Sequence, residues 1–540
     1  MRWQEEIQRR WYLLMKDILK TIKANYSGIL LTLILLVGAY LRLYHISQYM
    51  TFLGDEGRDM LVVLHMIVNH KFTLLGPTAS VGGFFLGPIY YYFMLPFVWA
   101  FHLDPSGAAI MVAAFGFVTI YLVYRLGRDM FDEWVGLMAA GLYALSPLVI
   151  AYSRSSWNPN PVPFFATAIV YFLWKSVVDK KTKLLFWIGV ALGIGLQLHY
   201  LFLFFFAVVG VWYLLYGRSW KWVPSYLLGV VGFVVGYAPF LAFELRHGFP
   251  NTISIIRFLQ EGKDTGLVPM KFVMTLVNVS YRLFGRLVFR MPPPEQIIHL
   301  TPFVQWLWPT GIAIVIISSL LIMLLALFGK IPVPWKSEGV LSERWKKGIV
   351  LLFLWFFVPL VLFGLYKKGI YDYYFGLFYA LPFFMTALIF RLGAVKRIGT
   401  WVMAALFAGL LYFNWLGMPF LFTPNNQLAQ TKLIARAALD TTGGRPFNFA
   451  LMTGGNSDHA YRYFFELWGR APVTIENTVI DPERKTVTDQ LVVICELSDC
   501  KPLGNSLWEI AGFGRAEIEG ESHVSFVTIL KLGHYKGKDL

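Results

Sequence analysis

Long apolar runs separated by short polar loops fill residues 28–417 of the chain. The first run, from Gly28 to Leu43, is followed at regular intervals by others, and the last ends near Trp415. Their lengths suit about eleven helices, because a helix needs roughly 20 apolar residues to cross a bilayer. The pattern therefore predicts a polytopic α-helical membrane protein with about 11 transmembrane helices.

One apolar run does not fit this count. Residues 84–101 are near spanning length, but Gly87-Pro88 and Pro96 interrupt them. Counting the run as a span would move nearly all the basic short loops to the outer side, whereas short basic loops stay in the cytoplasm. We therefore expect this run to lie on the outer surface or to insert halfway. The basic residues that set this orientation are Arg125, Arg128, Lys180, Lys181, Lys183, Arg218, Lys221, Lys330, Lys336, Arg344, Lys346, Lys347, Arg391, Lys396 and Arg397.

The same rule orients the remaining segments. Residues 1–27 form a basic amphipathic lead without a small-residue cleavage site, and we interpret them as a helix on the cytoplasmic surface. Residues 28–417 are the transmembrane domain, with a first outer loop at 46–104 and a long outer segment at 241–301. The protein is expected in the plasma (inner) membrane, with its amino terminus in the cytoplasm.

Residues 418–540 have a different, more polar pattern. Residues 447–452, 491–495 and 525–530 resemble strands, and 458–468 resembles a helix with Ser457 as its cap. This indicates a small α/β domain, which the span count places on the outer face. It holds both cysteines, Cys495 and Cys500, which form a disulfide in an oxidising compartment or stay as two free thiols; the sequence leaves both alternatives open.

Composition supports the membrane class and removes one alternative. Hydrophobic residues make up 57% of the chain and charged residues only 15%, against about 25% charged in soluble domains. The net charge of +15 would suit nucleic acid, but the basic residues lie in the loops between apolar runs. Membrane topology explains them, and we expect no nucleic-acid partner.

The first outer loop carries the densest group of ionisable residues. Asp55 and Glu56 follow the first span, Arg58 comes next, and Asp59 lies one helical turn beyond Asp55 on the same face of the expected helix 56–70. Ionisable groups at a membrane boundary suggest a functional site. The alternative is an ordinary solvated loop, because acidic residues also suit the first turn of a helix.

Three more polar groups lie at the same predicted face. They occupy residues 152–159, 244–249 and 366–374. Ordinary belt and snorkelling residues would explain each loop alone. Carboxylates and cations that face one aqueous cavity suit a phosphate-bearing ligand and a general base. The candidate groove residues are Arg58, Asp59, Trp157, Asn158, Glu244, His247, Tyr371, Asp372, Tyr373 and Tyr374, and the candidate phosphate-binding residues are Arg154, Arg246, Lys367 and Lys368.

A basic stripe follows in the outer segment, where Arg282, Arg286 and Arg290 recur at every fourth residue among apolar ones. We interpret it as an amphipathic helix on the membrane surface that attracts lipid headgroups. Contact with the phosphate of a lipid carrier is the alternative.

Together these motifs resemble a known family. An acidic pair after the first span, Ser153-Arg154-x-x-Trp157-Asn158-Pro159, Glu244-Leu245-Arg246-His247-Gly248-Phe249 and an outer carboxy-terminal domain are similar to the membrane glycosyltransferases of the GT-C fold. Within that fold the chain resembles the protein O-mannosyltransferase and aminoarabinose (lipid A) transferase group. The resemblance covers about residues 28–415, and it rests on the order of the motifs more than on any single one.

The resemblance implies a function. A sugar passes from a polyprenyl-phosphate-linked donor to the hydroxyl of a protein, lipid or glycan acceptor on the outer face. Asp55 takes the position of the family's catalytic base. We expect a single displacement with inversion, in which Glu56 or Asp59 orients the site and the cations above stabilise the leaving phosphate.

The chain departs from its relatives at two positions. Residues 83–88 contain no carboxylate where some relatives have an acidic metal ligand, so the loop does not support dependence on a divalent metal. Trp157-Asn158 stands where oligosaccharyltransferases have further acidic ligands, which argues against that activity.

Two other classes of function remain as alternatives. A transporter or flippase for lipid-linked sugars would also be polytopic, but it should show repeats and charged, broken helices at the midplane. A membrane scaffold would explain the outer domain, yet it gives no reason for Asp55 and Glu56 beside basic loops.

The topology yields the first testable prediction. A reporter enzyme that is active only outside the cytoplasm, fused after Leu540, should be active, whereas the same reporter fused before Met1 should be silent. The reverse pattern would contradict the orientation, and with it the placing of the four polar groups on the outer face.

Overall fold

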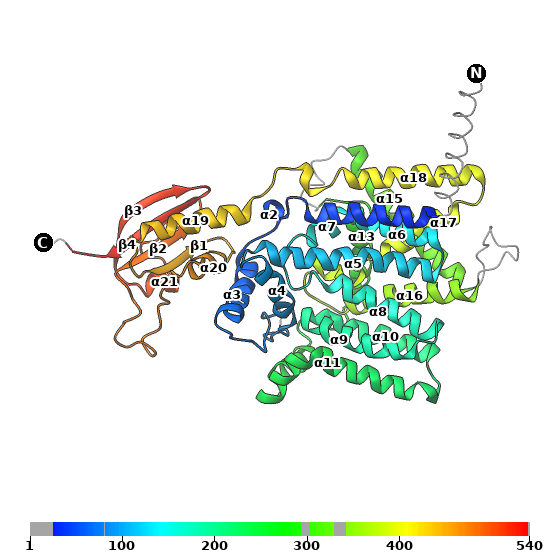
Figure 1. The fold of residues 1–540 in the computed structure, drawn as a ribbon, viewed down its shortest axis with the longest axis horizontal. Helices are drawn as coiled ribbons and strands as arrows, with labels where there is room; N and C mark the ends of the chain where they lie inside the picture. The colour runs from blue at the N-terminus through cyan, green and yellow to red at the C-terminus, as the bar shows by residue number, and fades with distance from the viewer. Residues whose placement is uncertain (1–24, 80–81, 293–301, 329–341, 538–540) are drawn as a thin grey trace, which may run out of the picture.

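The computed structural model describes residues 25–79, 82–292, 302–328 and 342–537. Most helices of the first three quarters of the chain run side by side along the long axis of the molecule (Figure 1). The carboxy-terminal domain lies at one end of this bundle, and helices α3 and α4 lie between the two (Figure 1). Residues 1–24 of the predicted lead are outside the described residues.

Six described helices are long and apolar enough to cross a membrane, or seven if the bent pair η4–α17 is one span. This confirms a multi-pass membrane protein. They are Asn25–Leu43, α5 (Ser106–Met130), α11 (Val223–His247, preceded by η3, Trp220–Trp222), α15 (Pro302–Leu327), α16 (Glu343–Gly364) and α18 (Arg397–Trp415), with η4 (Asp372–Phe378) and α17 (Leu381–Gly393) as the bent pair.

The other predicted spans also correspond to helices, although shorter ones. These are α6 (Glu133–Leu145) with α7 (Pro147–Tyr152), α8 (Val162–Val178), α9 (Leu185–Leu198) after η1 (Thr182–Leu184), and α10 (Phe204–Tyr216) after η2 (Tyr200–Leu203). The interrupted run gives only the short helix α4 (Ile89–Ala100), which lies at the end of the bundle near α3 (Figure 1). The run between Pro88 and Phe101 is thus a separate short helix.

Glycines let two of the helices approach closely. A Cβ on Gly189 of α9 would overlap the carbonyl oxygen of Gly229 on α11, and one on Gly193 would lie 2.7 Å from that of Phe233. Small residues at such crossings allow backbones to pack where apolar burial against lipid gives little driving force.

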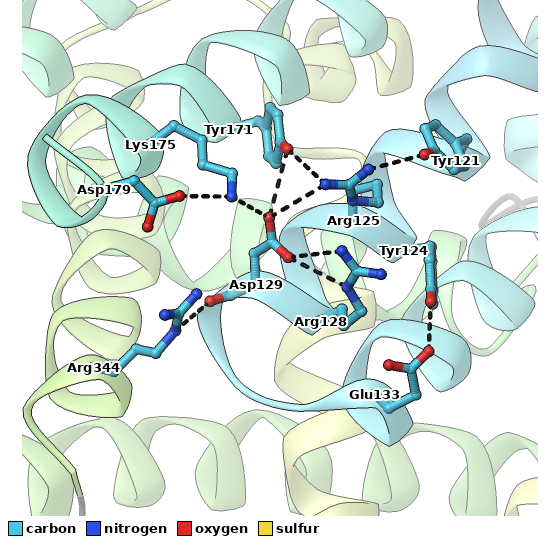
Figure 2. Close-up of polar contacts among 10 residues, drawn as sticks. All are labelled: Tyr121, Tyr124, Arg125, Arg128, Asp129, Glu133, Tyr171, Lys175, Asp179 and Arg344. Atoms are coloured by element: carbon cyan, nitrogen blue, oxygen red, sulfur yellow. Dashed lines mark hydrogen bonds and ion pairs between the residues drawn. The ribbon is translucent and has the colours of Figure 1, made fainter. Parts of the chain in front are cut away.

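Charged residues join the helices at the end of the bundle away from the carboxy-terminal domain. Asp129, at the end of α5, accepts a hydrogen bond from Lys175 of α8 at 2.5 Å (Figure 2). The Arg344 guanidinium of α16 donates to the backbone carbonyl of Asp129 at 2.7 Å. Arg125, Arg128 and Asp179 complete the cluster (Figure 2). Basic residues that the sequence places in inner loops therefore gather at one end, partly neutralised by acids.

The carboxy-terminal domain is built on a four-stranded sheet in the order β1-β2-β4-β3. β1 and β2 are parallel, and the other two pairings are antiparallel. Its strands are β1 (Asn448–Met452), β2 (Gln490–Cys495), β3 (Ala516–Val524) and β4 (Val527–His534). Its helices are α19 (Gln427–Thr441), α20 (His459–Leu467) and α21 (Trp508–Ala511).

The sequence indicates β1, β2, α20 and part of β4 correctly, and it misses β3 and α19. Asp458, not Ser457, is the N-cap of α20, so that cap assignment is wrong. Instead, the Ser457 hydroxyl lies 2.8 Å from Nδ1 of His459. Cys495 and Cys500 form a disulfide, which settles the alternative that the sequence left open.

The remaining elements are α2 (Ile46–Tyr49), α3 (Gly54–Val68), α12 (Pro250–Glu261), α13 (Pro269–Leu287) and η5 (Pro419–Leu421). Of these, α13 packs on α15 and α16 within the bundle. α3 confirms the helix expected at 56–70.

The carboxy-terminal domain packs directly on α3. The backbone N–H of Gly54 donates to Oδ1 of Asn456 at 2.9 Å. A Cβ on Gly57 would overlap the backbone nitrogen of Ala460, which leaves no space for a side chain. At the far end of α3, Nε2 of His65 lies 2.7 Å from a carboxylate oxygen of Glu466. The domain is thus fixed along the whole length of α3.

Because α3 approaches Ala460 so closely at Gly57, a single added methyl group should weaken the packing between α3 and the carboxy-terminal domain. Gly57→Ala should weaken the docking of the carboxy-terminal domain by about 1–3 kcal/mol, because the added methyl overpacks the contact with Ala460. Limited proteolysis of the 416–426 connection and the thermal unfolding midpoint in detergent would report it. Gly210→Ala in α10 is the matched control, since nothing lies within 4 Å of the place that its Cβ would occupy. Equal behaviour of the two variants would contradict the packing described.

Candidate functional site

Helix α3 begins with a capping arrangement that fixes its first turn. Leu53 is the N-cap, and its backbone N–H donates to Oε2 of Glu56 at 3.0 Å. Glu56 is 7% exposed, and burial raises the pKa of its carboxyl to about 7, although hydrogen bonds to the backbone oppose the shift. Glu56 therefore holds the start of the helix in place and offers little of its carboxylate to a ligand.

Asp59 and Arg58 form a second fixed unit. The fully buried Asp59 accepts hydrogen bonds from Nε and Nη2 of Arg58 at 3.0 and 2.8 Å. Burial raises the pKa of Asp59 to about 6, and the neighbouring Arg58 guanidinium acts against this rise. Both nitrogens donate to the same oxygen, Oδ1 of Asp59, and this contact orients the guanidinium so that its Nη1 lies 2.8 Å from Asp55.

Asp55 is the accessible carboxylate of the three. Its side chain is 55% exposed, whereas that of Asp59 is fully buried. It contributes to two neighbouring cavities at once, while Arg58 reaches only the smaller one. An exposed carboxylate between two cavities can meet ligands from both.

The larger cavity, of about 910 Å³, lies between the bundle and the carboxy-terminal domain. Its walls come from the start of α3, from the loop after α7 and from three loops of the carboxy-terminal domain. They include Thr51, Leu53, Gly54, Asp55, Glu56, Tyr152, Ser155, Trp157, Asn160, Gln427, Gly454, Gly455, Asn456, Ser457, Glu496 and Phe526.

The smaller cavity, of about 250 Å³, shares Asp55 and Trp157 with the larger one. Its other lining residues are Arg58, Pro77, Thr78, Ala79, Leu86, Asn158, Pro159, His199, Tyr200 and Tyr373. Trp157 and Tyr373 pack with ring centroids 4.4 Å apart. The smaller cavity is compact and polar, and the Arg58 guanidinium is the cationic hydrogen-bond donor on its wall.

An apolar groove of about 600 Å³ adjoins the smaller cavity at Tyr200, which lines both spaces. Leu196, Phe204, Ile256, Phe258, Leu259 and Leu362 are among its lining residues. The three spaces thus form a series, from polar to charged to apolar.

The four cations expected to hold a phosphate do not line these three spaces. Arg154 is buried, and its two Nη atoms donate to the carbonyl oxygens of Leu41 and Tyr44. Arg246 is exposed near the end of α11. The Lys367 ammonium donates to the carbonyl of Gly262 at 2.7 Å, and that of Lys368 pairs with Asp264 at 3.2 Å.

The motif at residues 244–249 makes structural hydrogen bonds and does not line any of the three spaces described above. The buried Glu244 carboxylate accepts from the backbone N–H and hydroxyl of Thr252 at 2.8 and 2.7 Å and from the Asn251 amide at 2.9 Å. Oδ1 of Asn251 accepts from the backbone N–H of Phe85 at 2.8 Å, so the unit ties α12 to the first outer loop. His247 is exposed and stacks on Phe243.

The residues of the 366–374 loop differ in their contacts: some lie at the smaller cavity, and others pair with a neighbouring helix. Tyr373 lines the smaller cavity, Tyr374 is buried with its hydroxyl 3.2 Å from that of Tyr200, and Tyr371 is 60% exposed. Asp372 instead pairs with Arg282 at 2.5 Å and Arg286 at 2.7 Å. The basic stripe of α13 therefore faces Asp372 in part, a contact that the interpretation as a helix attracting lipid headgroups does not include.

Asn158 belongs to the site, with its amide fixed by the carbonyl of Leu198 at 2.8 Å. Sequence reasoning missed the residues that the carboxy-terminal domain contributes, above all Asn456, Glu496 and Phe526. The turn-forming run Gly454–Ser457 is the one signal in the sequence that points to them. Among the described residues, no group of three or more His, Cys, Asp or Glu side chains is arranged to hold a metal ion.

Comparison with known proteins supports a class of enzyme. Residues 87–243 match the family model described as dolichyl-phosphate-mannose-protein mannosyltransferase. No curated protein sequence matches the chain significantly.

Solved structures show the fold. ArnT from Cupriavidus metallidurans, in the apo state and bound to undecaprenyl phosphate, is 13% identical over 94% of this chain and 98% of its own, with TM-scores of 0.55 and 0.51. The archaeal oligosaccharyltransferase AglB from Archaeoglobus fulgidus, in complex with an inhibitory peptide and a dolichol-phosphate, covers 87% of this chain and 70% of its own at 12% identity. Its TM-score of 0.46 is too low to carry an argument.

The chain therefore has the GT-C fold of ArnT, and residues 87–243 are similar to a mannosyltransferase family. Both findings agree with the resemblance stated from the motifs, and they favour a glycosyltransferase that uses a lipid-phosphate-linked sugar.

The burial of Glu56 predicts a pH dependence of stability. Its pKa rises from the ordinary 4.5 to about 7, so between these values the folded protein keeps a proton that the unfolded chain releases. The free energy of unfolding should therefore fall as the pH rises through this window. Glu56→Gln, which keeps an acceptor for Leu53, should flatten the curve of unfolding midpoint against pH, whereas Glu483→Gln, at an exposed carboxylate, is the control and should not. Parallel curves for wild type and Glu56→Gln would contradict the shift.

Proposed function

We propose that this protein transfers a sugar from a polyprenyl-phosphate-linked donor to an acceptor hydroxyl at the outer face of the membrane, with inversion. The observation that carries the proposal is the position of Asp55, the exposed carboxylate between a polar cavity and a charged one that leads to an apolar groove. ArnT, whose fold the chain shares, has been solved with undecaprenyl phosphate bound. A lipid-linked donor and a polar acceptor need this kind of divided site.

In the proposed reaction Asp55 acts as the general base. It accepts the proton of the acceptor hydroxyl while that oxygen forms a bond to the anomeric carbon of the donor sugar. The bond from this carbon to the phosphate oxygen breaks, and its electron pair leaves with the polyprenyl phosphate. Attack from the side opposite the leaving group inverts the anomeric carbon. Base catalysis of this type contributes about 10²–10⁴-fold.

Glu56 and Asp59 support this base without replacing it. Glu56 fixes the first turn of α3 through Leu53, and Asp59 fixes the guanidinium that touches Asp55. Both are buried, so neither offers an acceptor hydroxyl the access that Asp55 does. This agrees with the expectation that one of them orients the site.

Arg58 is the cation that we place at the donor phosphate. It lines the smaller cavity beside Asp55. As the phosphate leaves, its charge grows, and a prepositioned guanidinium stabilises that charge in a site with little water. Geometry favours Arg58 over Arg154, Arg246, Lys367 and Lys368, whose side chains lie outside this cavity.

The apolar groove would hold the first isoprene units. It begins at Tyr200, where the smaller cavity ends, and the exposed apolar residues Ile253, Ile256 and Leu259 of α12 lie along it or beside it. An apolar channel of this kind binds a hydrocarbon chain by excluding it from water.

The orientation and domain division extend this proposal. We propose about eleven spans, a cytoplasmic amino terminus, a transmembrane catalytic domain at 28–417 and an extracytoplasmic domain at 418–540. The separation of the basic cluster around Asp129 from the candidate site, at opposite ends of the bundle, supports this arrangement (Figures 1 and 2). A flippase for lipid-linked sugars is the alternative function, but the exposed carboxylate of Asp55 between two cavities favours transfer of the sugar.

Asp55→Asn tests the base directly. It keeps the size of the side chain and its hydrogen bond with Arg58, yet it cannot accept a proton. Turnover should fall by about 10²-fold or more while donor affinity is largely kept. Glu56→Gln is the matched control and should retain far more activity. If Asp55→Asn keeps full turnover and Glu56→Gln abolishes it, the roles are reversed; if neither matters, the site lies elsewhere.

A further inference from the structure

The larger cavity has an unbalanced set of charges. Asp55 and Glu496 contribute carboxylates to its walls, while the carboxyl of Glu56 is engaged in the cap of α3, and no Lys, Arg or His is among its described lining residues. The smaller cavity next to it is different, because Arg58 lines it. A cleft lined by charges of one sign concentrates its field in the enclosed space.

Within the described part of the chain, Glu496 is held on this wall by neutral hydrogen-bond donors only. The hydroxyls of Thr453 and Tyr461 donate to its carboxylate at 2.7 and 2.9 Å, and the Asn456 amide lies 3.4 Å from it. All three of these donors are neutral. They hold the carboxylate in place without cancelling its charge, so an anionic ligand would meet an uncompensated negative group.

The remaining lining residues suit a carbohydrate. Tyr152, Trp157 and Phe526 present aromatic surface, and Phe526 does so from the tip of the β3–β4 hairpin with 61% of its surface exposed. Asn160 and Gln427 add amide groups that both donate and accept. Apolar C–H faces of a sugar ring stack on aromatic rings, while its hydroxyls need paired donors and acceptors.

We propose that the larger cavity binds a neutral glycan as the acceptor and that Glu496, together with Asp55, excludes acceptors that carry phosphate. The inference rests on the proposed function and names the acceptor class for the same site. A sugar hydroxyl held against Trp157 would lie in the space that Asp55 also lines. A peptide is the competing acceptor, but the aromatic wall formed by Tyr152, Trp157 and Phe526 favours sugar rings.

The first experiment measures the field in the cavity with a thiol. Cys495 and Cys500 are bonded to each other, so Ser155→Cys introduces a single reactive thiol at the wall. Cationic and anionic methanethiosulfonates of equal size would be compared on the full-length protein. The cationic reagent should react at least about tenfold faster, relative to the same pair acting on free cysteine. Adding Glu496→Gln should reduce this ratio, whereas Glu483→Gln, on an exposed loop away from the cavity, should not.

The second experiment measures the acceptor class. Full-length protein would be applied to an array of neutral oligosaccharides, each printed beside its phosphate monoester, with Ser/Thr peptides as a third set. Neutral members should bind, their phosphate esters should bind at least about tenfold more weakly, and Glu496→Lys should narrow or reverse this difference. The Trp157→Ala variant should no longer bind the neutral glycans.

Three results would overturn the inference: equal or stronger binding of the phosphate esters, binding of peptides alone, or no binding of any neutral glycan. Retention of undecaprenyl phosphate by the same preparations separates this failure from failure of the proposed function. If the lipid binds and glycans do not, the acceptor assignment is wrong and the transferase proposal stands. If the lipid does not bind, the donor proposal fails, while the charge preference is still measured.

Discussion

The first turn of α3 is the constraint on which the candidate site depends. Its backbone is held from inside by Glu56, which accepts from Leu53, and from outside by Asn456, which accepts from Gly54. The two contacts fix the residue between them, Asp55, although Asn456 comes from a domain about 400 residues further along the chain. Gly54 and Gly57 make this possible, because any side chain there would overlap Ser457 or Ala460. A small cap interaction thus joins the two domains at the point where the proposed chemistry occurs.

The first turn of α3 also lies between the larger and the smaller cavity. Asp59 is buried behind Arg58 and directs the guanidinium towards the smaller cavity, while Asp55 faces both cavities. Burying two carboxylates is costly unless they are hydrogen-bonded, and here one caps a helix and the other binds a guanidinium. Their positions explain why an exposed aspartate, a cation and an apolar groove follow each other in order. This order suits a donor that is charged at one end and apolar at the other.

The sequence predicts local features well and long-range contacts poorly. The apolar runs, the helix at α3 and the two inner strands β1 and β2 follow from periodicity, and Asp55 follows from its place after the first span. The direction of a side chain does not follow from these patterns: Arg154 lies in the expected loop, yet its guanidinium points back to the end of the first helix. Asp372 was likewise expected in a groove but pairs with two arginines some 90 residues earlier. The contributions of Asn456 and Glu496 depend on how one domain docks on another, which no local pattern encodes.

Donor and acceptor meet at Asp55 in the proposed reaction, and every other assignment follows from that meeting point. A cryo-EM structure of the full-length protein with bound undecaprenyl phosphate tests it most directly. The phosphate should lie in the smaller cavity beside Arg58, with the isoprene chain continuing past Tyr200 into the apolar groove. A phosphate bound instead at Lys367 and Lys368, or anywhere out of reach of Asp55, would contradict this assignment.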